Sequence, residues 1–177
     1  MKRPVLGTIA ILILLCGGLY VGYTLQDRAP DRAVSRTFAD NGARAFMDKS
    51  LRIIPPSEAR DLSAAEESAG QSYSVLARFD LPPQELDSLL KQNDAFPTAV
   101  ELKDDPAVLQ SVIALGDAAK RPWWQPEQLQ GAHCAQRTSR RKQGTGFVKS
   151  IRYLCAGPGD AGYTRIYVAL VEEPEGK

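Results

Sequence analysis

Apolar and polar positions alternate along parts of this chain with a period of two, the pattern of a half-buried β-strand. The clearest case is residues 73–80, where Tyr73, Val75, Ala77 and Phe79 share one face. Residues 132–139, 147–155 and 163–171 follow as further strand candidates, with turn-forming residues between them. These segments predict a small antiparallel sheet that ends in a three-stranded meander.

Two other segments carry the wider spacing of an amphipathic helix. The first follows Pro83, which suits a first helical position, and has Leu86, Leu89 and Leu90 as its stripe. The second has Asp105 as a cap before Pro106, and its stripe is Val108, Leu109, Val112 and Ile113. Residues 58–68 fit a helix capped by Ser57, or else an edge strand over 58–66. The expected fold class is therefore α+β, with two or three helices packed on the sheet.

The N-terminus predicts a membrane segment. Residues 5–25 form an uncharged, mainly apolar run, about the length that a membrane-spanning helix needs. Lys2 and Arg3 precede this run, which favours a cytoplasmic N-terminus and an extracytoplasmic remainder. We expect a retained signal anchor. A cleaved secretory signal and a lipoprotein acylated on Cys16 remain open alternatives.

The predicted organisation has four parts: a transmembrane anchor (1–25), a juxtamembrane linker (26–45), an α+β domain (46–173) and a charged tail (174–177). The linker contains a weak apolar stripe, Val34 and Phe38, which fits a helix from Asp31 onward. The 22 basic and 21 acidic residues nearly balance, so total charge does not point to nucleic acid or to an acidic ligand.

Cys134 and Cys155 are predicted to form a disulfide. A hairpin with Gly144-Thr145 as its two-residue loop pairs Gln143 with Gly146, and the same register places Cys134 opposite Cys155. Counting outward from the turn, this is a non-hydrogen-bonded pair, whose Cα atoms lie close enough for a disulfide. Closing the loop would stabilise the fold by about 3 kcal/mol. An oxidising compartment outside the cytoplasm would maintain the bond.

The sequence offers little for catalysis or metal binding. His133 is the single histidine, and strand alternation turns it to the face opposite its neighbour Cys134, which argues against a catalytic thiol. Two thiols and one imidazole directed elsewhere do not make a metal site. The glycine-rich stretch 157–162 fits a nucleotide motif by spacing, but a strand rather than a helix follows it, so we expect a turn. We expect no cofactor and no metal.

Two features are candidates for contact with a partner. Arg140, Arg141 and Lys142 make the hairpin tip basic, which indicates either a solvated tip or a surface for anionic lipid, envelope polymer or an acidic protein. Trp123 and Trp124 lie among prolines, where one ring is expected to fill the gap between helix and sheet, with stacking on a partner as the alternative.

The order of the segments 51–62, 73–90, 122–129, 151–155 and 164–173 resembles a loose group of uncharacterised bacterial exported or membrane-anchored proteins. That resemblance implies an envelope location and a small α+β domain, and carries no activity. We expect a single-pass inner-membrane protein whose extracytoplasmic domain is a non-enzymatic binding or accessory module. A periplasmic immunity or inhibitor protein is the alternative, and nucleic acid is not an expected partner.

Overall fold

The computed structural model describes residues 34–70, 72–92, 102–116, 120–143 and 146–175. Residues from Ala33 to Lys177 form one compact unit, whose centre is a six-stranded antiparallel sheet in the order β1-β2-β3-β6-β5-β4. The strands are β1 (Val34–Ala39), β2 (Arg60–Ala69), β3 (Ser72–Leu81), β4 (His133–Gln143), β5 (Gly146–Pro158) and β6 (Thr164–Glu175). The expected α+β class and the antiparallel sheet are confirmed.

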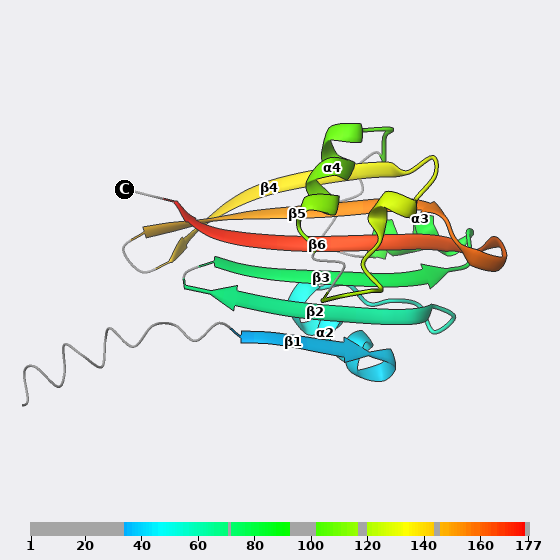
Figure 1. The fold of residues 1–177 in the computed structure, drawn as a ribbon, viewed down its shortest axis with the longest axis horizontal. Helices are drawn as coiled ribbons and strands as arrows, with labels where there is room; N and C mark the ends of the chain where they lie inside the picture. Colours follow the sequence, from blue (N-terminus) through cyan, green and yellow to red (C-terminus); the bar gives the residue numbers. More distant parts are fainter. Residues whose placement is uncertain (1–33, 71, 93–101, 117–119, 144–145, 176–177) are drawn as a thin grey trace, which may run out of the picture. The chain divides into compact units, whose positions relative to one another are not determined.

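Helices cover both faces of this sheet (Figure 1). The α-helices are α2 (Asp40–Leu51), α3 (Glu85–Gln92) and α4 (Pro106–Ala114), and two short 3₁₀ turns are η1 (Pro126–Gln128) and η2 (Asp160–Gly162). The back core packs α2 and α3 against residues such as Val75, Phe79 and Ile166. The front core packs α4 and the segment before β4 against residues such as Leu76 and Tyr167. Strand alternation therefore supplies two cores, one from each set of side chains.

The N-terminal part of the unit differs from the sequence expectation. Residues 34–45, expected as linker, form β1 and the first half of α2, and Ala43 in α2 is fully buried. The strand lacked an alternating pattern because five of its six residues are exposed. Its existence depends on pairing with β2 along the whole strand, from Val34 opposite Ser68 to Ala39 opposite Ser63.

Other boundaries also shifted. The ambiguous stretch after Ser57 is a strand, β2, and it lies between β1 and β3 rather than at an edge. β6 continues through Pro174 to Glu175, so the first two residues of the expected tail pair with β5. At α4, the carboxylate of Asp105 accepts hydrogen bonds from the amides of Ala107 and Val108, both at 3.1 Å, which confirms the predicted cap.

The predicted anchor, residues 1–25, and the predicted turn, Gly144-Thr145, lie outside the described residues. No helix in the described ranges is both long enough and apolar enough to cross a bilayer.

Candidate functional site: a groove beneath α3

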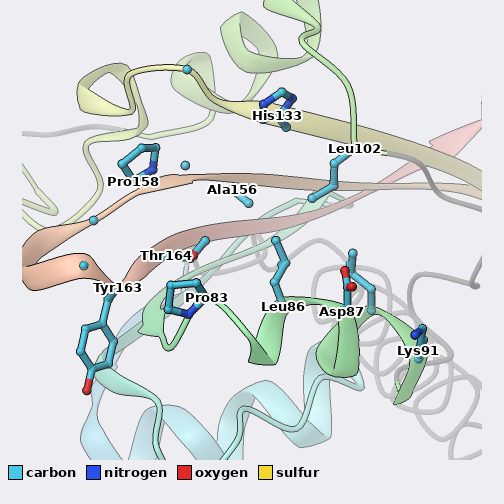
Figure 2. A pocket seen from close by; sticks show the side chains of 15 residues that line it. Pro83, Leu86, Asp87, Lys91, Leu102, His133, Ala156, Pro158, Tyr163 and Thr164 are labelled. Carbon is cyan, nitrogen blue, oxygen red and sulfur yellow. The ribbon is translucent and has the colours of Figure 1, made fainter.

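A groove of about 890 Å³ opens between α3 and the end of the sheet where β5 ends and β6 begins (Figure 2). Its volume lies in the range of small-molecule binding sites. Its apolar lining consists of Pro83, Leu86, Leu90, Leu102, Ala156 and Pro158. Its polar lining consists of Asp87, Lys91, His133, Tyr163 and Thr164. Segments distant in sequence therefore converge on one apolar hollow with a polar rim.

The leucine stripe of α3 explains why one wall of the groove is apolar. Leu89 points into the back core and is only 3% exposed, whereas Leu86 and Leu90 remain half-buried beside the groove. The helix begins later than predicted, because Pro83 lies in a turn closed by a 2.9 Å hydrogen bond from the Glu85 amide to the Pro82 carbonyl. The short helix therefore cannot cover the whole end of the sheet.

The loop between β5 and β6 forms the end of the groove, and it is tightly closed. The Gly159 amide donates to the Tyr163 carbonyl at 2.8 Å, and the Tyr163 amide donates to the Asp160 carbonyl at 3.1 Å. A side chain at Gly159 would lie 3.2 Å from the Arg165 and Tyr163 backbones, which explains why this position is glycine. The expected strand–turn–strand reading of residues 157–162 is confirmed, since η2 is a single 3₁₀ turn.

A buried ion pair holds this end of the sheet. Asp80 is fully buried, and its two carboxylate oxygens accept hydrogen bonds from Nε and a terminal nitrogen of Arg165, each at 2.9 Å. The hydrogen bond with Asp80 is the main reason that the pKa of Arg165 is raised. Arg165 also donates to the Asp160 carboxylate at 2.6 Å, which lowers the pKa of Asp160. This network joins β3, β6 and the loop that borders the groove.

Tyr163 is positioned by a second arginine. The Arg60 guanidinium carbon lies 3.5 Å from the centre of the Tyr163 ring, and the same side chain donates to the Asp160 carbonyl at 2.8 Å. A cation over an aromatic face is attractive, so the ring is held in one place at the edge of the groove. The end of the groove is thus preorganised by contacts that come from β2, β3 and β6.

The rim carries mixed polarity. Asp87 and Lys91 are one turn apart on α3, where opposite charges attract, and both side chains are exposed. His133 lies across the groove from α3 (Figure 2). The charges of Asp87 and Lys91 cancel, so these two residues would not select strongly for an anionic or a cationic ligand.

Sequence reasoning did not identify His133 as a groove residue. Strand alternation correctly placed His133 and Cys134 on opposite faces of the sheet. The sequence did not indicate which element would pack near His133. The sheet order places the start of β4 beside the end of β5, and His133 pairs with Ala156 there. Strand alternation then directs both side chains to the α3 side.

The predicted disulfide is confirmed. Cys134 pairs with Cys155 in the predicted register, the Cα atoms are 4.1 Å apart, and the sulfurs are bonded. The amide and carbonyl of Cys134 both bond to Lys103, at 2.7 and 3.0 Å, on the other edge of β4. The cysteines are therefore a non-hydrogen-bonded pair across the hairpin, as the count from the turn predicted. Both lie in the front core and take no part in the groove.

The other predicted site residues also lie away from the groove. Trp124 is 1% exposed, meets Tyr167 edge-on at 5.1 Å between ring centres, and donates from its indole nitrogen to the Val112 carbonyl at 3.3 Å. It fills the space between α4 and the sheet. Trp123 is half-buried and edge-on to Trp124.

The basic residues of the hairpin extend from the opposite end of the sheet. Arg140 pairs with Glu175, and Arg141 pairs with Glu172 at 2.8 Å, while Lys142 is exposed. Two of the three predicted cations thus have intramolecular partners.

Within the described ranges, no three His, Cys, Asp or Glu side chains come together in a way that could hold a metal ion. Comparison of the chain with protein-family models, with curated proteins and with solved structures found no match.

Proposed function

We propose that this chain is a membrane-anchored binding or accessory module of the bacterial envelope, without enzymatic activity, and that its ligand binds in the groove beneath α3. The observation that carries the proposal is an apolar hollow of about 890 Å³ whose rim has a few polar groups, because this is the usual construction of a small-molecule site. The disulfide supports a location outside the cytoplasm.

The lining indicates the chemistry of the ligand. Leu86, Leu90 and Leu102 favour an apolar body, since burial of hydrocarbon against them releases water. The His133 imidazole and the Thr164 hydroxyl are hydrogen-bonding groups for one polar end. A small amphipathic molecule with an uncharged polar end fits these features. The two cysteines of the described part are joined to each other, which favours binding over thiol catalysis.

Photolabelling of the full chain in its native membranes tests this proposal. The probe is a medium-chain alcohol that carries a diazirine, and mass spectrometry maps the labelled peptides. We expect labelling to concentrate on residues 83–92 and 156–164 and to fall when unlabelled alcohol is added in excess. Leu86→Arg should reduce groove labelling at least about tenfold, because it places a charge against the apolar body.

Ile54→Arg is the matched control. Ile54 is a large apolar residue that is 63% exposed and does not line the groove, so its replacement should leave labelling unchanged. Labelling spread evenly over the chain, or unaffected by excess alcohol, would contradict the proposal even if Leu86→Arg failed to fold.

A further inference from the structure

The chain enters its folded unit at the same end of the sheet as the tip of the β4–β5 hairpin. The pairs Val34–Ser68, Ser68–Tyr73, Tyr73–Glu172 and Glu172–Ser150 run across the sheet from the start of β1 to β5, and β5 extends beyond this row to Gly146. Gln143 and Gly146 then form the last pair before the hairpin turn. Figure 1 shows the start of β1 and the β4–β5 tip at one end of the sheet, with the groove-side loop between β5 and β6 at the other.

These two points lie at opposite lateral edges of that end. β1 is one edge strand of the sheet and β4 is the other, with β5 beside it. At a spacing of roughly 4.8 Å between strands, β1 and β5 are separated by about 19 Å. A surface that contacted both the start of β1 and the hairpin tip would fix the orientation of the sheet. Attachment at β1 alone would leave the sheet free to rotate.

The length of chain before β1 would limit how far this end can lie from a membrane that holds the proposed anchor. An anchor over residues 5–25 leaves residues 26–33 before Val34, and eight residues reach at most about 28 Å when fully extended. The hairpin tip can therefore come within the Debye length of about 8 Å from a charged surface without strain in the tether.

The charge of this part of the sheet is positive. Six basic residues lie on the hairpin: Arg137, Arg140, Arg141, Lys142, Lys149 and Arg152. Arg137 and Arg152 lie further along the strands, where Arg152 donates to the Leu51 carbonyl. The other four basic residues adjoin Glu172, Glu173 and Glu175 on the end of β6, which leaves an excess of one positive charge at the tip. The charged residues of β1 and β2 near this end are paired. Arg36 of β1 pairs with Glu66 of β2, and Glu67 of β2 pairs with Arg121 from the segment before η1.

The tip itself combines cations with an aromatic ring. Lys142 is exposed and makes no ion pair with any residue in the described ranges, and Lys149, which forms no ion pair there either, lies opposite Glu173 across the strands. Phe147 is 41% exposed, and the Arg140 guanidinium carbon lies 4.0 Å from the centre of its ring. Lysine and an exposed aromatic ring together suit the boundary between lipid head groups and hydrocarbon.

From these observations we infer that the hairpin tip, residues 140–143 and 146–149, is a second contact with the membrane and binds an anionic lipid surface. The inference rests on the anchor of the proposed function, but it does not depend on the groove. The tether at one edge and the electrostatic contact at the other orient the domain so that the groove, at the far end of the sheet, faces away from the bilayer.

Hydrogen–deuterium exchange of the full chain in vesicles tests the inference. One set of vesicles contains phosphatidylcholine alone, and the other contains phosphatidylcholine mixed with phosphatidylglycerol. We expect the amides of the hairpin tip to exchange several-fold more slowly in the anionic vesicles. High salt should abolish this difference, because it screens the attraction.

Lysine variants provide the matched comparison. Lys142→Gln with Lys149→Gln removes two positive charges without breaking an ion pair among the described residues, and it should abolish the dependence on anionic lipid. Lys49→Gln removes a positive charge from α2, outside both the hairpin and the groove, and should preserve that dependence. Equal exchange in the two kinds of vesicle would overturn the inference. Stronger protection by soluble polyglutamate than by anionic vesicles would also overturn it and would point to an acidic protein.

An alkaline carbonate wash separates the two proposals. A chain that washes off the vesicles lacks the anchor, which overturns both the envelope proposal and this inference. A chain that stays in the vesicles but shows equal exchange overturns this inference alone, and groove labelling reports independently on the ligand site.

Discussion

Helices pack on both faces of the sheet, but the apolar surface of those helices is buried to different extents on the two faces. On the front face, α4 is followed by Trp124, whose indole fills the space between helix and sheet, and a disulfide lies in the same core. On the back face, α2 packs closely, but α3 leaves Leu86 and Leu90 half-buried beside a groove. No large side chain covers the apolar stripe of α3, so part of that stripe stays accessible to the proposed ligand. Changes in the front core should therefore lower stability without affecting the groove, and changes in the α3 wall of the groove should weaken the proposed ligand binding.

The largest expected effect comes from Trp124→Ala. Truncation of a fully buried tryptophan leaves a cavity and loses its packing, so the free energy of unfolding should fall by about 3–5 kcal/mol. Denaturant titration measures the loss. Trp123→Ala, at a half-buried ring, should cost clearly less. Equal losses from the two variants would show that Trp124 is not the residue that completes the front face.

Gly116→Ala tests the same contact from the other side. A Cβ at Gly116 would lie 1.8 Å from Cδ1 of Trp124, so the indole would have to move. Overpacking of this kind costs about 1–3 kcal/mol. If the indole moves only locally, groove labelling by the diazirine alcohol should persist in this variant, because the groove lies on the opposite face.

Loss of the disulfide should also lower the stability of the front core. Replacement of Cys134 and Cys155 by alanine opens a loop with a sequence separation of 21 and should reduce the free energy of unfolding by about 3 kcal/mol. In the denatured wild-type chain, thiol labelling of Cys134 and Cys155, mapped by mass spectrometry, should be negligible until a reductant is added. Ready labelling without reductant would show that the bond does not form in the cell.

The contrast between the faces also explains what the sequence could predict. The hairpin register and the disulfide follow from local rules, because a two-residue turn fixes every pair outward from Gln143 and Gly146. The Asp105 cap is local in the same sense. The groove is not local: Leu86, His133 and Thr164 meet only because β6 inserts between β3 and β5.

The N-terminal strand was missed for a related reason. β1 is an exposed edge strand, so neither face imposes an apolar alternation on its sequence. Only the partner strand β2 determines that residues 34–39 are extended, and that partner begins about twenty residues later in the chain. The spacing of Val34 and Phe38 fits a helix, and the sequence of this segment alone does not reveal that it pairs with β2. In the structure Phe38 instead stacks on Phe46 of α2, with ring centres 4.3 Å apart.

The smallest expected effect on stability comes from the groove itself. Leu86→Ala removes a half-buried side chain that borders an open hollow, so the free energy of unfolding should fall by only about 1 kcal/mol. Leu89→Ala, on the same helix, removes a side chain that is 3% exposed and should cost about 2–5 kcal/mol. Denaturant titration of the two variants gives the comparison.

Photolabelling should rank these two variants in the opposite order. Leu86→Ala removes part of the apolar wall and should weaken groove labelling by the diazirine alcohol several-fold, whereas Leu89→Ala leaves the groove lining in place. A fully buried leucine that governs stability and a half-buried leucine that governs binding would then lie three positions apart on one short helix. If both variants lost stability and labelling in proportion, the groove would be a packing feature of α3 rather than a ligand site, because labelling would then follow only the folded fraction.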